Sequence, residues 1–427
     1  MKRFAGVFGA IFLVSGALFA ADWDESGYGS LSDYLLGIYG IDNNAGLTAF
    51  PILNVPIGGR YAAVSGAFSA VSSDLTCLES NPAGTATLEQ TGLAFFHNNW
   101  IADTKVEGAA FAIRFGNLGL GAAGKWLWTP FAEYDDFGKN LSKGYYSEAA
   151  GTLNVSYNFF KGYYFEGISV GLNLKGALRS VPDYAGSQSE SAAAGSGKEQ
   201  SAFAIMADLG FLTRINLFKP YISNEKNTSF ALVFRNYGGD VGAGDPLPAA
   251  LAAAVSYKPS RALTLSFDAA IPIYIENFTH VDTSLSEKPY FSFGVSGAIT
   301  SFLQVSGGFT IKSGGIRAVV GAETKIDSMS FYLNYTLDLV TQLQPLNRVT
   351  IGVRFDMGDM GRAAKRAACE KAYLDGVTAY NEGRDDDARA NWQEALRIDA
   401  KFQPATEALF VLENFEKLEN RILGMLE

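Results

Sequence analysis

The chain is poor in the residues that build metal sites and disulfide frameworks. Its 427 residues include two cysteines and two histidines. Cys77 and Cys369 lie 292 residues apart, a spacing that predicts neither a disulfide framework nor a zinc site. His97 and His280 have no Cys, Asp or Glu cluster near them at metal-ligand spacing. We therefore expect no metal and no cofactor.

Two further absences narrow the function. No strand is followed by a glycine-rich loop and a helix in the manner of a nucleotide site, and no Ser/His pair stands out as a nucleophile and its base. A net charge of −10 repels phosphate, so nucleic acid is not an expected partner. The sequence predicts a protein that is not an enzyme.

Long apolar runs are also missing beyond the N-terminus, so the sequence predicts no membrane-spanning helix there. At the N-terminus itself, Lys2 and Arg3 precede an apolar run from Phe4 to Leu18, and small residues follow at Ala20 and Ala21. This order predicts a secretory signal peptide over residues 1–21, with cleavage after Ala20 or Ala21. The alternative is an uncleaved membrane helix. In the first case the protein is exported.

Charge is scarce over most of the chain and concentrated at its end. Residues 362–427 carry 10 basic and 13 acidic groups in only 66 residues. Residues 1–361 carry far fewer charges per residue. Such a contrast indicates two physical environments and therefore two structural parts.

What the long central region does have is alternation of apolar and polar residues, which is typical of strands with unlike faces. Residues 329–339 show it clearly, since Phe331, Leu333 and Tyr335 alternate with Asn334 and Thr336. The same pattern predicts about fourteen strands within residues 91–355, at 91–101, 104–115, 118–128, 146–159, 166–178, 201–213, 228–237, 249–258, 261–273, 289–298, 302–312, 315–324, 328–339 and 347–355.

Two architectures fit fourteen such strands. A soluble sandwich would bury the apolar face, whereas a membrane barrel turns it toward lipid. The leader, the number of strands and the sparse charges of both signs on the polar face favour an all-β transmembrane barrel of about 14 antiparallel strands. Most of the longer connections fall between odd and even strands, including 129–145, and these are expected to be outer loops.

Residues 22–90 precede the barrel as an N-terminal segment. They contain Gly58-Gly59-Arg60, a run of small residues to Ala70, then Asp74 and Asn81-Pro82-Ala83-Gly84. By composition the last element is simply a turn. Ahead of a fourteen-stranded barrel, this order resembles the FadL/TodX family of outer-membrane transporters of long-chain fatty acids and hydrocarbons, and also PorV/PorQ-like barrels. The resemblance implies a hatch that plugs the lumen and includes Arg60, Asn81, Pro82, Ala83 and Gly84.

The resemblance also directs attention to a ligand groove and an exit. The predicted outer loop 129–145 and the strand before it offer Trp126, Trp128, Phe131, Tyr134 and Phe137 as an apolar groove. Family members release ligand sideways where a strand bends inward. Gly119, Gly121 and Gly124 make the third strand the candidate for that opening, although glycine also simply fills crowded barrel interiors.

Residues 362–427 are predicted to form a small all-α periplasmic extension. Cys369 to Phe402 is partly similar to a tetratricopeptide repeat, and a further amphipathic helix follows. The acidic composition of the chain and this helical extension look most like the spirochaetal branch of the family. The region is either a plain helical cap or a docking surface for a periplasmic protein, with Trp392, Leu412 and Phe415 as candidate contacts.

Together these features predict an outer-membrane uptake channel for long-chain fatty acids or similar hydrophobic molecules, in contact with outer-membrane lipid. Outer loops would capture the ligand, the hatch would gate it, and the wall would release it laterally. The alternative is a PorV-like structural or shuttle component of an outer-membrane secretion or assembly complex.

Overall fold

The computed structural model describes residues 37, 40, 42–100, 103–134, 137–181, 201–241, 245–276, 280–282, 284–312, 315–338 and 346–426. The predicted signal peptide, residues 1–21, lies outside the described residues. In the described part of the chain, no helix combines the length and the apolar character needed to cross a membrane.

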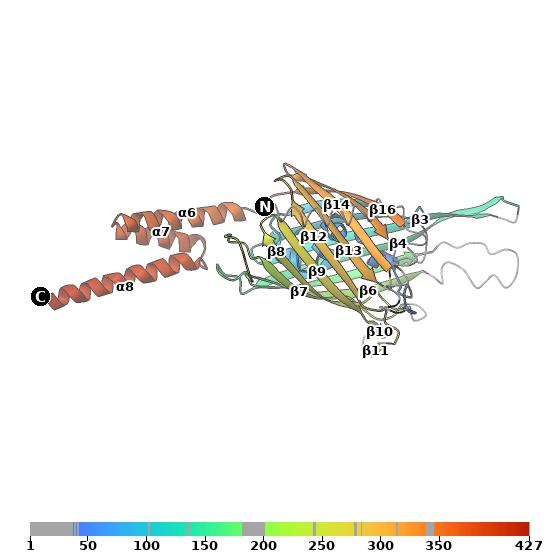
Figure 1. Ribbon diagram of the computed structural model, residues 1–427, viewed down its shortest axis with the longest axis horizontal. Helices are drawn as coiled ribbons and strands as arrows, with labels where there is room; N and C mark the ends of the chain where they lie inside the picture. The colour runs from blue at the N-terminus through green and yellow to red at the C-terminus, as the bar shows by residue number, and fades with distance from the viewer. Residues whose placement is uncertain are drawn as a thin grey trace.

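Fourteen antiparallel strands close into a barrel, as the alternation predicts (Figure 1). Each strand pairs with its neighbours in the chain, except that β9 pairs with β12, and the first strand pairs with the last to close the ring. The strands are β1 (Gly92–Asn99), β2 (Lys105–Phe115), β3 (Leu118–Tyr134), β4 (Asn140–Phe159), β5 (Ile168–Ser180), β6 (Ala202–Ile215), β7 (Thr228–Tyr237), β8 (Ala250–Ser260), β9 (Leu263–Pro272), β12 (Tyr290–Ala298), β13 (Leu303–Lys312), β14 (Gly315–Ile326), β15 (Met329–Asp338) and β16 (Leu346–Asp356).

The two faces of the barrel differ as expected for a wall between lipid and a filled interior. Leu153, Leu333 and Ile351 are half or more exposed on the outside. The polar residues that alternate along the strands with these apolar residues, such as Asn154 and Asn334, are buried. This arrangement is the reverse of a soluble sandwich, in which apolar side chains fill the core and polar ones face water.

One predicted loop is wrong. Residues 129–145 were expected to form an outer loop, but β3 runs on to Tyr134 and β4 begins at Asn140. The two strands stay paired from Leu118↔Tyr157 to Tyr134↔Asn140. This hairpin projects from the barrel end opposite the helices (Figure 1). The predicted loop 274–288 likewise contains two short paired strands, β10 (Tyr274–Glu276) and β11 (His280–Asp282).

The segment ahead of β1 lies inside the barrel. It contains four short helical turns: η1 (Pro51–Asn54), α3 (Gly59–Ala63), α4 (Cys77–Ser80) and η2 (Pro82–Thr87). Most of its residues from Phe50 to Leu88 are buried, including Phe50, Phe68 and Leu78. We call residues 50–88 the lumen segment. Directly before it, the Ala49 N–H donates to the Pro246 carbonyl in the connection between β7 and β8 at 2.7 Å.

Three helices follow the barrel at the opposite end from the β3–β4 hairpin (Figure 1). They are α6 (Arg362–Asn381), α7 (Asp385–Ile398) and α8 (Gln403–Leu426). Cys369, Ala388, Trp392, Ala395 and Leu412 form their common apolar core. The helices contact the barrel rim at the β4–β5 turn, where the Tyr164 hydroxyl donates to Glu407 at 3.1 Å. The helical extension predicted from the charge contrast is therefore present, and its similarity to a tetratricopeptide repeat stays a prediction.

Candidate functional site

The lumen segment is held by polar side chains that point inward from the barrel wall. The Asn81 side chain donates to the Phe211 carbonyl in β6 at 3.2 Å and to the Ser69 carbonyl at 2.9 Å. Asn154 of β4 donates to the Pro82 carbonyl at 3.0 Å, and Asn173 of β5 donates to the Leu78 carbonyl at 2.9 Å. These bonds satisfy buried backbone groups that no helix or sheet in the segment can satisfy.

The predicted hatch element Asn81–Gly84 thus lies inside the barrel, directly against β4, β5 and β6. It fits there because the facing strands carry glycine. A Cβ on Gly171 or Gly210 would overlap Pro82, and a Cβ on Gly84 would lie 2.6 Å from Cβ of Cys77. No role for these strand glycines is predicted from the sequence, although they alternate with the outward-facing Leu172 and Leu209.

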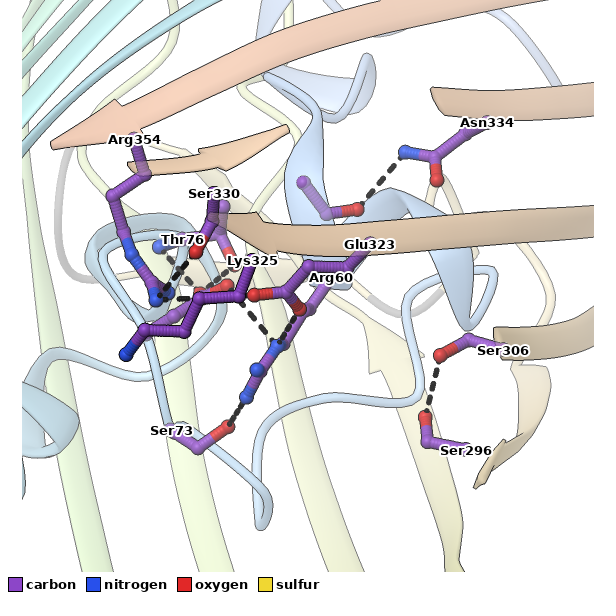
Figure 2. Close-up of polar contacts among 12 residues, drawn as sticks. Arg60, Ser73, Thr76, Ser296, Ser306, Glu323, Lys325, Ser330, Asn334 and Arg354 are labelled. Atoms are coloured by element: carbon purple, nitrogen blue, oxygen red, sulfur yellow. Dashed lines mark hydrogen bonds and ion pairs between the residues drawn. The ribbon is translucent and has the colours of Figure 1, made fainter. Parts of the chain in front are cut away.

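Arg60 anchors the segment to β14, and Figure 2 shows its contacts. Its Nε donates to Glu323 Oε2 of β14 at 2.5 Å and lies 3.9 Å from Asp74 Oδ2. Arg354 of β16 lies 3.8 Å from the other oxygen of Glu323. The Asn334 side chain donates to the Gly59 carbonyl at 2.9 Å, so the helix that carries Arg60 is tied to the wall twice.

A cavity of about 140 Å³ lies between the lumen segment and the wall. Its described lining includes backbone and side chains of Tyr61, Ser65 and Gly66 from the segment. The wall contributes most of the charge. Six cationic side chains line the cavity, against two carboxylates, those of Glu79 and Asp268. The six are Lys125, Lys175, Arg235, Lys312, Arg317 and Arg348.

Several of these cations are held in place by specific contacts. Lys125 Nζ lies 2.6 Å from Glu79 Oε1 and donates to the Ile52 and Val55 carbonyls at 2.8 Å each. Lys175 Nζ lies 2.7 Å from Asp208 Oδ2. Buried ions need such partners, because an uncompensated charge in this environment is costly. The lining therefore contains a cluster of cationic side chains that specific contacts hold in place.

The wall beside this cavity has an irregularity between β6 and β7. Leu209 pairs with Phe234, but the next pair is Ala207 with Tyr237, so β7 carries one extra residue. Asn236 sits in this bulge with a positive φ of 54°, and its N–H donates to Asp208 at 2.7 Å. Its side chain accepts from Lys175 at 3.0 Å and donates to the Pro248 carbonyl at 2.9 Å.

Beyond the bulge the two strands separate. Ala202–Met206 of β6 pair with β5, and the described part of β7 offers them no partner. The space is filled by the connection after β7, since Gly238 packs against Ile205 and Met206, and Leu247 joins the apolar cluster around Phe50. Bulges bend strands and end pairing, and they are frequent beside functional sites.

The predicted opening in the third strand is wrong. β3 pairs without a break with β2 from Lys105↔Trp128 to Phe115↔Leu118, and with β4 as far as Glu133. Gly119 and Gly121 serve close packing instead: a Cβ on Gly119 would overlap the Thr85 backbone, and one on Gly121 would lie 2.6 Å from Leu78. Gly124 faces outward.

The predicted aromatic groove is not assembled either. Trp126 is half exposed and shares the outward parity of β3 with Trp128. The two rings lie 6.1 Å apart, and Trp128 meets Tyr145 at 5.8 Å, so these residues form an outer aromatic patch. Tyr134 and Phe137 are exposed at the tip of the hairpin. Phe131 lies in β3, and its side chain is outside the described part of the chain.

Two of the three predicted partner contacts are also misplaced. Trp392 and Leu412 are buried within the helical core, where Trp392 packs on Gly376 and Tyr380. Phe415 is exposed. Helix α8 has two apolar faces. Helical spacing alone does not show which of them packs against α6 and α7.

The protein belongs to the class of closed β-barrels whose interior is filled by their own N-terminal segment. A family model described as "Uncharacterised protein family (UPF0164)" matches residues 40–359, and the chain belongs to this family. A UPF0164 protein of Treponema pallidum (strain Nichols) is 28% identical over 382 residues, covering 86% of this chain and 83% of the relative. Another from the same organism is 26% identical over 382 residues, covering 84% and 74%.

Solved structures of similar shape include two channels. The "CymD monoaromatic hydrocarbon channel" has a TM-score of 0.47 at 12% identity and covers 73% of this chain and 99% of its own. The Pseudomonas putida toluene transporter TodX has a TM-score of 0.41 at 12% identity, with coverage of 66% and 94%. The resemblance to the FadL/TodX family and the relation to PorV/PorQ-like barrels both stay predictions.

Proposed function

We propose that this protein is an outer-membrane channel for amphiphilic carboxylates such as long-chain fatty acids, gated by the lumen segment. The apolar exterior and closed ring suit a bilayer, in which every backbone polar group must be paired. The observation that carries the substrate class is the cavity lining, where six cationic side chains gather; Lys125, Lys175, Arg235 and Lys312 each lie within 4 Å of a carboxylate, and Arg317 and Arg348 are the other two. A bare hydrocarbon gains nothing from such a surface, whereas a carboxylate head group does.

The size of the cavity determines which part of the ligand can enter it. A space of about 140 Å³ is comparable to one that holds a benzene ring, so it admits a head group but not a long acyl chain. Passage of the tail therefore requires movement of the lumen segment or of the wall. The contacts of Arg60 and Asn81 hold the segment in the closed arrangement.

The bulge between β6 and β7 supports a lateral exit at this place. Asn236 and Lys175 line both the cavity and the irregular stretch of wall. Among the described strands, Ala202–Met206 pair only with β5, so an acyl chain can leave there without breaking a complete ladder. In this mechanism the head group stays with Lys175 while the tail enters the membrane first.

Uptake into liposomes tests the substrate class. Purified protein is reconstituted, and the entry of palmitic acid, its methyl ester and a plain alkane is compared. A charge-assisted hydrogen bond contributes about 1.5–3 kcal/mol, so we expect the acid to be preferred by about tenfold or more. Equal rates for the acid and the ester would refute the carboxylate assignment, and the absence of uptake of all three would refute the channel.

Two lysines provide a matched pair for the same assay. Lys312 lines the cavity and lies 2.7 Å from Glu287, whereas Lys258 lies 3.4 Å from Glu225 near the end of β8 and does not line it. Lys312→Gln should lower the preference for the acid over the ester, and Lys258→Gln should leave it unchanged.

The second candidate is a component of an outer-membrane secretion or assembly complex. It is favoured by one observation, the exposed apolar side chains of α8. Isolation of a stable complex through residues 362–427, together with no lipid uptake, would support this role over transport.

A further inference from the structure

The last helix carries an apolar seam that no described part of the chain covers. Val411, Phe415, Leu418, Ile422 and Met425 are all exposed, with exposed fractions between 46% and 76%. Their spacing is four, three, four and three residues, which is the a/d pattern of a coiled coil. We call these five side chains the α8 seam.

Other residues of α8 already make contacts within the helical region. Ala405 and Leu412 face the core shared with α6 and α7, and Arg389 of α7 forms an ion pair with Glu416. Glu413 and Lys417, which are exposed, lie off the seam. The seam is thus a second apolar face, distinct from the one that holds the helical region together, and α8 extends beyond α6 and α7 in Figure 1.

The heptad spacing selects a helix as the occupant, because only a facing helix with the same period fills such a seam over several turns. A second copy of this chain supplies that helix with its own seam. If both barrels stand in one membrane, as in the proposed function, the two α8 helices leave the same membrane face and run parallel. In a parallel pair the seam residues meet their own counterparts, which is the self-matching that a twofold interface requires.

The barrel wall above α8 offers a surface that fits the same arrangement. α8 starts beneath the β4–β5 turn, where the rings of Phe402 and Tyr163 lie 5.1 Å apart. On that side the outward residues Ala109, Gly124, Gly151 and Gly176 are directly paired across β2 to β5. They floor an open apolar depression of about 560 Å³.

These glycines differ from those that face the lumen. A Cβ on Gly151 would meet nothing within 4 Å, and one on Gly124 would meet only the Ala150 carbonyl at 3.9 Å, so packing inside this chain does not require glycine there. Small residues at a membrane-embedded surface let another protein surface approach closely. A stable interface buries about 1,600 Å² in total, an area to which both the seam and the depression would contribute.

We infer that this protein forms a parallel twofold dimer in the membrane, joined by the α8 seam of each copy and by the β2–β5 face above it. The inference rests on the membrane placement in the proposed function, and it does not depend on the cargo. The contact surface consists of the five residues of the seam and does not include Trp392 and Leu412, which are buried.

Disulfide trapping of the full-length protein in liposomes tests the dimer. Leu418→Cys places a thiol at a d position, where the two copies lie close enough for a disulfide in a parallel pair, and Lys417→Cys places one next to it but off the seam. Under mild oxidation we expect Leu418→Cys to form a covalent dimer about tenfold faster than Lys417→Cys. The unsubstituted chain sets the background. Its cysteines, Cys77 and Cys369, are buried, and burial raises the pKa of the Cys369 thiol, so it contributes little.

A second measurement guards against a variant that fails to fold. The mass of the intact protein in mild detergent should be that of two chains. Phe415→Asp should reduce this mass to one chain and leave the heat-dependent shift of the barrel's electrophoretic mobility unchanged. A monomeric mass for the intact protein, or equal trapping at positions 417 and 418, would overturn the inference. A dimer without uptake would refute the proposed channel only, and uptake by a monomer would refute the dimer only.

Discussion

Arg60 of the lumen segment and Glu323 of the barrel wall form an ion pair with an Nε–Oε2 distance of 2.5 Å, although 263 residues separate them in the chain. The Glu323 side chain is 8% exposed and that of Arg60 is 25% exposed, so water screens the pair only in part. Because Arg60 is at the start of a short helical turn of five residues, this contact fixes the position of that turn against the wall.

Breaking this pair should loosen the lumen segment. Glu323→Gln leaves Arg60 with Asp74 at 3.9 Å as its remaining acidic neighbour. We expect a loss of about 2 kcal/mol in unfolding free energy, less than the roughly 3–5 kcal/mol of fully buried pairs, and a higher rate of channel opening in planar bilayers. Lys258→Gln, which removes an ion pair with Glu225 whose side chains are 39% and 73% exposed, is the control and should change neither quantity. Unchanged opening in Glu323→Gln would show that the pair does not hold the gate.

Two adjacent glycines of β13 test the packing of the segment. A Cβ on Gly308 would lie 2.6 Å from the backbone of Val64, whereas one on Gly307 would meet only the Val319 carbonyl at 3.5 Å. Gly308→Ala should therefore destabilise the filled barrel by about 1–3 kcal/mol through overpacking. Gly307→Ala should be close to neutral. Thermal unfolding of the two variants gives the comparison, and equal melting temperatures would contradict the close contact.

Removal of the extra residue in β7 should close the proposed exit. Deletion of Asn236 leaves one residue between Phe234 and Tyr237, matching the single residue Asp208 between their partners in β6. We expect the ladder to become regular and uptake of palmitic acid to fall strongly. Binding of the acid, measured by fluorescence in detergent, should persist. Normal uptake in a well-folded deletion variant would place the exit elsewhere.

The helical region should depend on one aromatic side chain. Trp392 is buried, and Gly376 is needed beside it because a Cβ there would lie 2.5 Å from the indole ring. Trp392→Ala should cost the helices about 3–5 kcal/mol and expose residues 362–426 to protease. The barrel should stay resistant, since its strands do not share this core. Cleavage patterns at increasing protease concentration would reveal whether the two parts respond independently.

Sequence reasoning located the barrel well because the membrane imposes a strict period of two. Most predicted strand limits agree with the observed ones within about two residues, as for 228–237 and Thr228–Tyr237. It failed at 129–145, where Pro130 and several polar residues argued for a loop. An outer extension of a hairpin has water on both faces, so alternation is lost while pairing continues.

The site was harder to predict, because its residues come together only when the ring closes. Lys125, Lys175 and Arg235 were recognised as polar-face residues, but nothing in their spacing showed that they share one cavity. For the glycines of β3 the sequence left two roles open, a bend in the strand or the filling of a crowded interior, and Gly119 and Gly121 have the second role. Whether a strand glycine permits a bend or admits a neighbour depends on what lies opposite, and here Thr85 and Leu78 lie opposite Gly119 and Gly121.

The threaded lumen segment has a consequence for biogenesis. It enters from the outer connections and leads directly into β1, whose partners are β2 and the last strand, β16. The β1–β16 seam joins residues more than 250 positions apart, so its formation carries the largest entropic cost of any strand pairing in the ring. We therefore expect the sheet to curve around the lumen segment before β1 pairs with β16, because the segment leads directly into β1.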